Sequence, residues 1–487
     1  MKPESKMLTL KHLLCGIDTL ETAGDLSCEI SSVVYDSRRV TPGALFVALP
    51  GSHVDGARYI EEAAQRGAAA VLSQTPCGLG GNFPCVQVAN ARRALARLSG
   101  TFYGHPAVRL CSVGITGTNG KTTVSFMLRE IFKAAARRPG LLGTVRYEIG
   151  NRVLPATRTT PEAPDIQFML AQMDRSGCDS VIMEVSSHAL DQHRVEGIPF
   201  DVGVFTNLTQ DHLDYHGTFE EYFEVKCRLF SQVRRYAVIN HDDPWGRRLL
   251  TECRFDAERL SYGFEEGAEV RGLDPQTDAH GSRMRVESPW GGADISLQLI
   301  GRFNLHNALA AFAVAAALGI PLETIRDALA GMENVPGRLE AVGGSKNKRV
   351  FVDYAHTDDA LLNVLQALRE ITPGRLVVVF GCGGNRDTGK RRLMGEVASR
   401  LADYSIITND NPRHESPEKI AVDITAGFDS ERKYEIILDR RDAIARGVGL
   451  IGKKDVLLVA GKGHETVQEF AGTIVPFDDR ETVREVL

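Results

Sequence analysis

Hydrophobic positions in this chain form short strand-like runs that alternate with amphipathic helical stretches, the pattern of α/β proteins. The clearest helix falls within residues 121–136, where apolar residues follow the spacing i, i+3, i+4, i+7 from Val124 to Ala135. The apolar run at 108–116 precedes it and reads as a buried strand. The sequence GTNGK joins them, so strand, glycine-rich loop and helix occur in the order that phosphate binding requires.

The loop departs from the usual Walker A spacing. That motif needs a glycine five residues before its Gly-Lys pair, but Ile115 stands there and the glycines fall at Gly114 and Gly117. A polyphosphate is held by backbone N–H groups of small residues at a helix N-terminus, with a lysine closing over them. Gly117 and Gly120 permit the tight backbone and Lys121 supplies the charge, so we interpret the loop as a shorter variant.

Changes in the pattern divide the chain into three regions that share no repeat. The first has strand-like runs at 31–37, 43–49 and 68–73, a helix-like stretch at 57–67 and no phosphate loop. The pair Pro336–Gly337 has the composition of a linker. The prediction is an α/β fold with three domains: an N-terminal domain (1–105), a central P-loop parallel-sheet domain (106–336) and a C-terminal Rossmann-like α/β domain (337–487).

In the third region, three apolar runs each stop at a polar loop: RLVVVF before GCGGNRD, YSIIT before NDNPR, and DVLLVA before GKGHE. Ligands of open parallel sheets bind at the carboxyl ends of the strands, so these loops predict a binding site. Arg386 and Arg413 lie in two of the loops, with Asp410 beside Arg413 and Glu465 in the third. Such a set would complement a small zwitterion, and a group of surface salt bridges explains it equally well.

Composition and charge narrow the classes of function that this protein could have. The 487 residues suffice for about three domains, and 43% hydrophobic with 25% charged residues is ordinary for a soluble enzyme. The net charge of 57 − 63 = −6 is spread along the chain, which argues against a nucleic-acid partner. The N-terminus lacks the apolar segment of a signal peptide, and the apolar run at 308–320 is too short to span a bilayer. We expect a cytoplasmic monomer with reduced cysteines and no membrane contact.

Two further positions, Glu184 and His212, are candidates for metal chemistry, and a third, Lys226, is a lysine among aromatic residues. Glu184 ends a strand-like run, where a carboxylate beside a P-loop usually holds Mg²⁺ together with the hydroxyl after the loop lysine, here Thr122. The alternative is a surface glutamate beside two serines that cap a helix. His212 lies in an Asp- and His-rich segment that, alone, is more often a solvated turn. Lys226, among aromatic residues at 219–230, is by itself typical of a snorkelling lysine.

Several motifs occur together in one order: GTNGKTT, EVSSHAL, LTQDHLDYHG, KCRLF, GRFNLHNALAA, VPGRLE, YAHT and DNPR. In this combination the chain resembles the Mur ligase family of peptidoglycan precursor synthesis over nearly its whole length. The resemblance implies that ATP phosphorylates the free D-glutamate carboxylate of UDP-N-acetylmuramoyl-L-alanyl-D-glutamate. An amino group of meso-2,6-diaminopimelate then attacks the acyl phosphate. It also implies that the short G-x-x-G-K-T loop binds ATP with Mg²⁺.

The resemblance assigns roles to individual residues. Lys226 matches a carbamylated lysine, whose anionic carbamate helps to hold Mg²⁺, and this replaces the snorkelling interpretation. Lys121, His212 and Lys226 carry the catalytic roles, and the metal ligands are Thr122, Glu184, His212 and Lys226. The nucleotide residues are Gly117, Thr118, Asn119, Gly120, Lys121, Thr122 and Thr123, with Asn304 and His306 expected near the adenine.

The remaining assignments concern the two other substrates. The uridine end of the first is expected at Ser37, Ser52, His53 and Val54. Its muramoyl dipeptide is expected at Thr159, Thr160, Ser186, Gln192 and Arg194. The amino acid is expected at Arg386, Asp410, Asn411, Pro412, Arg413, Gly461 and Glu465.

Three positions depart from the family pattern: Arg158 replaces an asparagine, Asp358 a proline and Ser416 an acidic residue. Three other readings remain open at this point. The ligase could add L-lysine instead. A folylpolyglutamate synthase shares the P-loop ligase chemistry, although DSRRVTPG and DNPR would have no role there. A nucleotide-dependent switch would use ATP without forming a bond.

Overall fold

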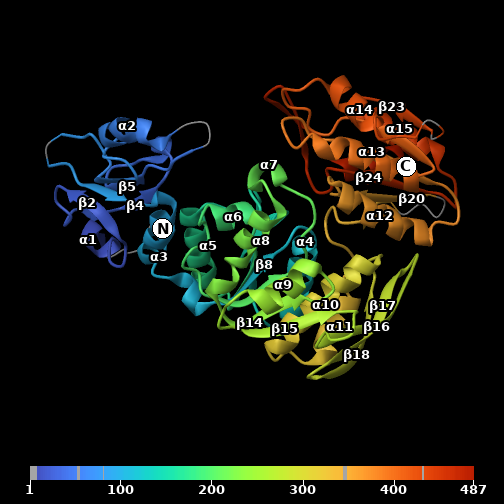
Figure 1. Cartoon of the computed structure of the whole chain (residues 1–487), viewed down its shortest axis with the longest axis horizontal. Helices are drawn as coiled ribbons and strands as arrows, with labels where there is room; N and C mark the ends of the chain where they lie inside the picture. The colour runs from blue at the N-terminus through green and yellow to red at the C-terminus, as the bar shows by residue number, and fades with distance from the viewer. Residues whose placement is uncertain (1–7, 52–54, 81, 344–347, 430, 432) are drawn as a thin grey trace.

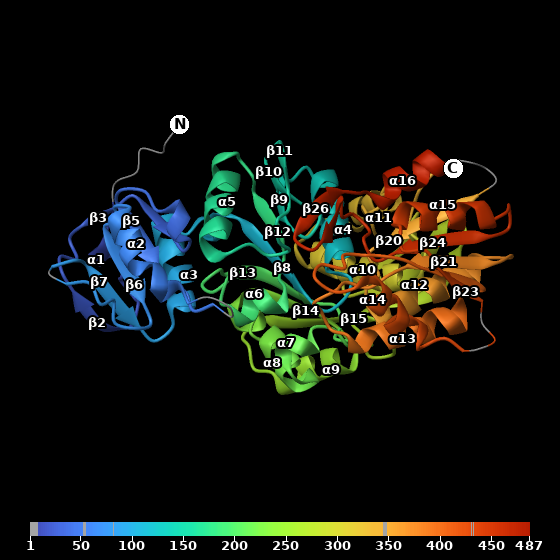
Figure 2. The same cartoon turned by 90° about the horizontal axis from the view of Figure 1, so that it is seen from above.

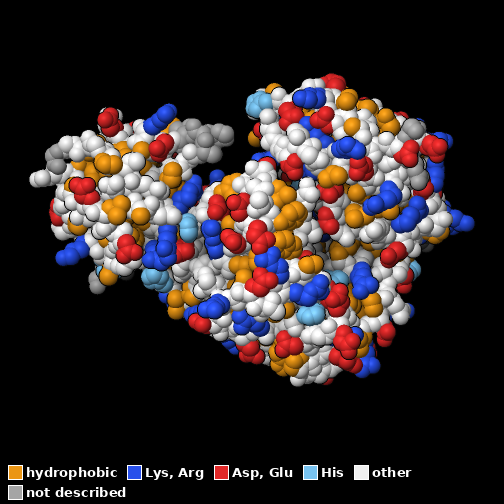
Figure 3. All heavy atoms as spheres, viewed as in Figure 1, with side chains coloured by type: hydrophobic (Ala, Val, Ile, Leu, Met, Phe, Trp, Pro, Cys, Tyr) orange, Lys and Arg blue, Asp and Glu red, His pale blue; other side chains and the backbone are white. Residues whose placement is uncertain are grey.

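The computed structural model describes residues 8–51, 55–80, 82–343, 348–429, 431 and 433–487. Ser52, His53 and Val54 of the predicted uridine site therefore lie outside the described residues. The chain forms three lobes in sequence order, with the N-terminal and C-terminal lobes at opposite ends of the central one (Figures 1 and 2). On the face shown in Figure 3, a notch separates the two outer lobes, and acidic and basic side chains are interspersed.

The N-terminal lobe is built on a sheet in the order β2-β7-β6-β5-β4, in which only the β2–β7 pair is antiparallel. Alternating buried residues of these strands pack against α3 around Leu45, Leu72 and Leu95. The elements are β1 Leu8–Thr9, α1 Leu10–Leu13, β2 Thr19–Ala23, β3 Glu29–Ile30, β4 Ser32–Val34, β5 Ala44–Val47, α2 Ile60–Gln65, β6 Ala70–Ser73, β7 Cys85–Val88 and α3 Ala91–Phe102.

The central lobe contains, within the described residues, an eleven-stranded sheet in the order β11-β10-β9-β12-β8-β13-β14-β15-β16-β17-β18. The predicted parallel sheet is present from β9 to β16, and antiparallel strands extend it at both edges. Its strands are β8 Cys111–Thr116, β9 Pro139–Leu142, β10 Arg146–Ile149, β11 Arg152–Pro155, β12 Ser180–Glu184, β13 Phe200–Phe205, β14 Val233–Asn240, β15 Glu258–Gly263, β16 Val270–Asp278, β17 Gly281–Ser288 and β18 Gly291–Leu297.

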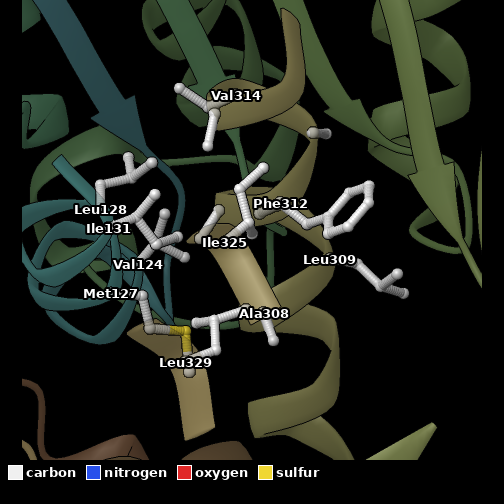
Figure 4. Packing of buried hydrophobic residues seen from close by; sticks show 14 of the residues in the cluster. Val124, Met127, Leu128, Ile131, Ala308, Leu309, Phe312, Val314, Ile325 and Leu329 are labelled. Carbon is white, nitrogen blue, oxygen red and sulfur yellow. The ribbon is translucent and has the colours of Figure 1, made fainter. Parts of the chain in front are cut away.

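The helices of the central lobe are α4 Lys121–Ala134, α5 Ala163–Arg175, α6 Ser187–Asp191, α7 Leu213–His216, α8 Phe219–Cys227, α9 Pro244–Glu252, α10 Arg302–Ala317 and α11 Leu322–Ala330. The predicted helix after the phosphate loop is α4, and its apolar stripe packs on α10 and α11 (Figure 4). The apolar run at 308–320 belongs to α10, which is buried on nearly all sides. No helix of the described residues is long and apolar enough to cross a membrane.

The C-terminal lobe has a sheet in the order β19-β20-β24-β21-β22-β23, parallel except for β19. The three predicted strands are β21, β22 and β24, and they lie next to one another. The elements are β19 Glu340–Ala341, β20 Arg349–Asp353, α12 Asp358–Ile371, β21 Leu376–Phe380, α13 Gly389–Leu401, β22 Tyr404–Ile407, α14 Pro417–Thr425, β23 Tyr434–Ile436, α15 Arg440–Leu450, β24 Val456–Ala460, β25 Val467–Phe470, β26 Thr473–Pro476 and α16 Asp479–Val486.

The α/β class with three domains is therefore confirmed. The boundaries predicted between 105 and 106 and between 336 and 337 stay predictions. The segment at 335–338 is a tight turn in which Val335 and Arg338 pair as an isolated bridge. It connects the buried α10–α11 layer to the C-terminal sheet.

Replacing Phe312 by alanine should destabilise the central lobe, because the Phe312 ring extends from α10 and is fully buried in the hydrophobic core of that lobe. Removing a buried phenylalanine side chain typically costs about 3–5 kcal/mol. We expect a lower midpoint for the central-lobe transition in differential scanning calorimetry. Phe168→Ala, at a side chain that is 45% exposed, is the control, and equal shifts for the two variants would contradict this packing.

Candidate active site

The phosphate-type loop has the backbone of an anion cradle. Gly117 and Gly120 both have positive φ, 146° and 89°, and a Cβ atom at either would collide with Thr206 or Asn307. Glycine is therefore required at both positions. The Lys121 ammonium folds over the loop and donates to the carbonyl oxygens of Gly117 at 2.8 Å and Thr118 at 2.9 Å. An incoming phosphate would take over these contacts at the N-terminus of α4.

The loop is braced by the segment after β13, which sequence reasoning did not single out for this role. The Asn119 backbone N–H donates to Asn207 Oδ1 at 2.9 Å, and the Thr206 hydroxyl donates to the Asn119 carbonyl at 2.6 Å. Both residues follow directly from a strand that neighbours β8 in the sheet. Parallel pairing of β8 and β13 thus places the two loops against each other.

Glu184 lies at the carboxyl end of β12 and is fully buried. Its carboxylate accepts hydrogen bonds from the Thr122 hydroxyl at 2.9 Å and from the Thr144 backbone and hydroxyl at 2.9 and 2.8 Å. No side chain of a described residue forms an ion pair with the Glu184 carboxylate. A buried carboxylate without a cation is costly, and oxygen donors of this kind suit Mg²⁺. Thr144 was not predicted, because no local motif marks it.

Lys226 is buried on α8, which excludes a snorkelling lysine. Its ammonium lies 4.4 Å from the centre of the Tyr222 ring, and it has no ion pair with a described residue. Burial, together with the positive charge of Lys121, lowers the pKa of Lys226 well below its ordinary value, against the pull of Asp211. A lowered pKa favours the uncharged amine, which is the form that acts as a nucleophile.

His212 has a left-handed backbone (φ 55°) at the start of α7, and its ring lies 4.8 Å from that of His188. Burial lowers the pKa of His212 to about 3, despite the carboxylate of Asp211 at 3.3 Å. The imidazole is accordingly neutral at pH 7, as a metal ligand must be. The metal assignment of His212 stays a prediction.

A cavity of about 520 Å³ opens between the central and C-terminal lobes. It is lined by eleven of the predicted residues: Thr118, Asn119, Gly120, Lys121, Thr122, Thr123, Thr159, Glu184, Ser186, His212 and His306. Asn304 is not among the lining residues. Its amide donates to the Ile300 carbonyl at 2.9 Å and accepts from Asn307 at 3.2 Å, so Asn304 supports Asn307, which lines the cavity together with His306.

The C-terminal lobe closes the cavity with groups that reach the phosphate loop. Arg338, in the linker turn, donates from Nη2 to the Thr122 hydroxyl at 3.1 Å and stacks 4.7 Å from the centre of the Tyr354 ring. Asp359, at the start of α12, accepts from Asn119 Nδ2 at 2.8 Å and from the Thr209 hydroxyl at 3.1 Å. Sequence reasoning noted VPGRLE and YAHT as motifs but assigned these two residues no role.

The residues expected around the muramoyl dipeptide are brought together beside Glu184. The Thr160 hydroxyl donates to the Glu184 carbonyl at 2.8 Å, and Arg194 donates to the Thr160 carbonyl at 2.8 Å and to Gln192 at 2.7 Å. Ser186 donates its backbone N–H to the Thr160 hydroxyl at 3.0 Å. Ser37 is buried in the N-terminal lobe, in a short 3₁₀ turn.

The three departures from the family pattern each have a definite environment. Arg158 pairs with the buried carboxylate of Glu162, which Arg194 also contacts at 3.1 Å. Ser416 caps α14 by accepting a hydrogen bond from the Lys419 backbone, so it performs the capping that an acidic residue would provide. Asp358 begins α12, and burial raises its pKa.

The residues expected to bind the amino acid form a second cluster at the carboxyl ends of β21, β22 and β24. Asn411 donates to Glu465 at 3.1 Å, and the buried Lys462 ammonium contacts both, at 3.1 and 2.9 Å. Arg413 contacts Glu469 and the Gly384 carbonyl, at 3.1 and 2.7 Å. Other members of the predicted set are Arg386, Asp410, Pro412 and Gly461. Lys462 and Glu469 were not predicted.

The fold and the site define a class: three-domain α/β proteins in which a P-loop lies beside a buried carboxylate, in a cleft that the last domain closes. Models of the Mur ligase family match most of the chain, as the Mur ligase family catalytic domain (29–103), the Mur ligase middle domain (115–315) and the Mur ligase glutamate ligase domain (337–463). The chain belongs to the Mur ligase family.

Among curated relatives, the chain is 42% identical over 481 residues to a UDP-N-acetylmuramoyl-L-alanyl-D-glutamate--2,6-diaminopimelate ligase from Caldanaerobacter subterraneus, covering 99% of both chains. It is 45% identical to the protein of that name from Geobacillus kaustophilus, covering 94% of both. A solved structure of a ligase with the same name superposes with a TM-score of 0.70 at 32% identity, covering 99% of this chain and 98% of the other.

Asp359→Ala should loosen the contact between the C-terminal lobe and the phosphate loop, because two hydrogen bonds to a carboxylate are lost. Such bonds contribute about 1.5–3 kcal/mol each. We expect small-angle X-ray scattering of the ligand-free variant to show a larger maximum dimension, with the hinge near 335–337. Asp327→Ala, at an exposed carboxylate on α11, is the control. Superimposable profiles for all three proteins would contradict this role.

Proposed function

We propose that this chain is an ATP-dependent ligase that adds meso-2,6-diaminopimelate to UDP-N-acetylmuramoyl-L-alanyl-D-glutamate in the cytoplasm. The amide bond forms at the D-glutamate side-chain carboxylate through an acyl phosphate. The observation that carries the proposal is the fully buried Glu184 beside the phosphate loop, whose carboxylate accepts hydrogen bonds from Thr122 and Thr144 and forms no direct ion pair with a described residue. The names of the relatives at 42% and 45% identity support the choice of substrates.

The phosphate loop and Lys121 would bind the triphosphate and neutralise charge as the phosphoryl group moves to the acceptor carboxylate. Thr122, Glu184, His212 and Lys226 would hold Mg²⁺, which supplies positive charge between two anionic reactants when bound. Arg338 of the C-terminal lobe contacts Thr122 across the cleft. With the lobe in this position, its guanidinium would lie next to the phosphoryl group that is transferred.

Lys226 would take part as a carbamate. Its amine is buried and its pKa is lowered, so the uncharged form that reacts with CO₂ is available at neutral pH. The reaction forms an N–C bond and releases one proton, which converts a neutral amine into an anion. An anion at this position would offset the positive charge of Lys121 and the metal. It would also account for a buried lysine that forms no ion pair with a described residue.

The acceptor substrate would extend from the N-terminal lobe to Glu184. Thr160, Gln192 and Arg194 form one hydrogen-bonded group there, and Arg92 of the N-terminal lobe reaches Gln192 at 3.5 Å. Thr159 and Ser186 line the cavity next to the phosphate loop. This route would place the dipeptide carboxylate next to the nucleotide, while Ser37, Ser52, His53 and Val54 hold the uridine end.

A direct test is mass spectrometry of the product formed from the UDP-dipeptide, ATP and an equimolar mixture of meso-diaminopimelate and L-lysine. The expected product carries one diaminopimelate, and phosphate release requires both other substrates. Phosphate release without them would favour a nucleotide-dependent switch.

Lys226→Ala should reduce tripeptide synthesis at least a hundredfold, because the carbamate is lost. Acetate or another short carboxylic acid should restore part of the rate by occupying the space. Product formation is measured with and without the acid, and Lys133→Ala, at an exposed lysine on α4, is the control. Full activity of the alanine variant would disprove the role of Lys226.

Arg413→Ala should raise the KM for meso-diaminopimelate by about two powers of ten and leave the KM for ATP close to unchanged. The reason is that a guanidinium can grip the far carboxylate, and each charge-assisted hydrogen bond contributes about 1.5–3 kcal/mol. Arg392→Ala, on the exposed face of α13, controls for lost charge. An equal fall in activity with every amino acid would instead indicate that Arg413 only braces its loop.

A further inference from the structure

The Arg413 guanidinium has two hydrogen-bonding edges, Nε with Nη2 and Nη1 with Nη2, and it has a protein acceptor on Nε and on Nη1. Nε donates to Glu469 Oε2 at 3.1 Å, and Nη1 donates to the Gly384 carbonyl at 2.7 Å. Nη2, which is shared by both edges, makes no hydrogen bond to a described residue. A carboxylate needs two adjacent N–H groups for a bidentate grip. It can obtain them through Nε and Nη2 only by displacing Glu469.

Glu469 is held at this place by its backbone. It lies in β25, whose hairpin partner is β26, and its N–H donates to Asn411 Oδ1 at 3.1 Å. The Arg413 N–H donates to the Glu469 carbonyl at 3.1 Å, and the Ala471 N–H donates to the Arg413 carbonyl. The hairpin is therefore tied to the DNPR loop by main-chain bonds that do not depend on the Glu469 side chain.

The side chains of the pair are free to exchange partners. Arg413 is 22% exposed and Glu469 is 36% exposed, so the Glu469 carboxylate can turn into water at little cost. Ion pairs with this exposure contribute modestly. A second carboxylate could therefore compete for the guanidinium, and it would meet repulsion from Glu469 until that side chain moves away.

We propose that Glu469 is a specificity-determining residue that occupies Arg413 in the empty site and is exchanged for the far carboxylate of the amino-acid substrate. The inference rests on the proposed function. The pairing of Glu469 with Arg413 would change how strongly the site distinguishes meso-diaminopimelate from L-lysine. With Arg413 unpaired, an amino acid without the far carboxylate, such as L-lysine, would bury an uncompensated guanidinium. With Glu469 in place that penalty is absent, so Glu469 weakens both the affinity for diaminopimelate and the rejection of lysine.

The test is Glu469→Gln, which keeps the size of the side chain and removes its charge. We expect the KM for meso-diaminopimelate to fall about three- to tenfold and the KM for L-lysine to stay the same or rise. The ratio of the two kcat/KM values should thus increase by a similar factor, and the KM for ATP should not change. Glu469→Asp retains the charge and should behave like the unsubstituted protein or lie between the two.

The matched control is Glu435→Gln, which breaks a comparable half-buried pair with Arg446 at 2.9 Å on the edge strand β23. Titration of meso-diaminopimelate into each protein by calorimetry gives a second readout that does not need turnover. If Glu469→Gln changes the KM for diaminopimelate no more than the control does, the inference is wrong. It is also wrong if Glu469→Gln raises that KM, which would indicate that Glu469 positions Arg413 or binds an ammonium group. If the unsubstituted protein makes no tripeptide, the proposed function itself fails.

Discussion

The buried carboxylate of Glu184 is the feature on which the rest of the site depends. Three hydrogen bonds from Thr122 and Thr144 satisfy its oxygen atoms, and no described residue forms a direct ion pair with it. Its negative charge opposes the effect of burial that lowers the pKa of Lys121. Such a group is tolerated only where a cation is available, because an isolated charge in a protein interior is costly. The parallel strands β8 and β12 bring it to the phosphate loop, so that one cation can serve both the carboxylate and a bound nucleotide.

The proposed binding roles are divided among the three lobes. The central lobe holds the phosphate loop and Glu184, and the C-terminal lobe adds Arg338 and Asp359 to the rim of the cavity. Those two residues contact opposite ends of the loop, at Thr122 and Asn119. Reactive groups carried by different lobes meet only when the lobes are closed, which also excludes water from an acyl phosphate.

In the C-terminal cluster, the charged side chains that could bind a ligand already pair with groups of the protein. Lys462 is buried against Glu465 and Asn411, and Arg413 is shared between Glu469 and a carbonyl oxygen. An amino acid bound in this cluster would replace some of these internal contacts. Selectivity in such a site therefore depends on the difference between the two sets of contacts and not on the presence of a complementary charge alone.

The local sequence predicted the helices and strands of this protein more completely than it predicted the side-chain contacts between them. The strand, loop and helix around Lys121 were predictable because glycine spacing and a helical apolar stripe are local properties, and the three strands before the polar loops of the last domain were predictable for the same reason. The site residues predicted from the motifs make up eleven of the 32 residues that line the cavity. The antiparallel hairpins at the edges of the central sheet, β10–β11 and β16–β18, were not foreseen, although their strands pair with neighbours in sequence.

Only the tertiary structure showed which side chains meet across those elements. Thr144 reaches Glu184 from a neighbouring strand end, Arg338 reaches Thr122 from 216 residues away in sequence, and Glu469 reaches Arg413 through a hairpin. Local spacing also could not distinguish a snorkelling Lys226 from a buried one, because the packing around α8 decides it. Sequence by itself thus determined the fold class and the chemical groups, whereas burial and long-range pairing, which depend on the whole packed chain, decided their charge states and partners.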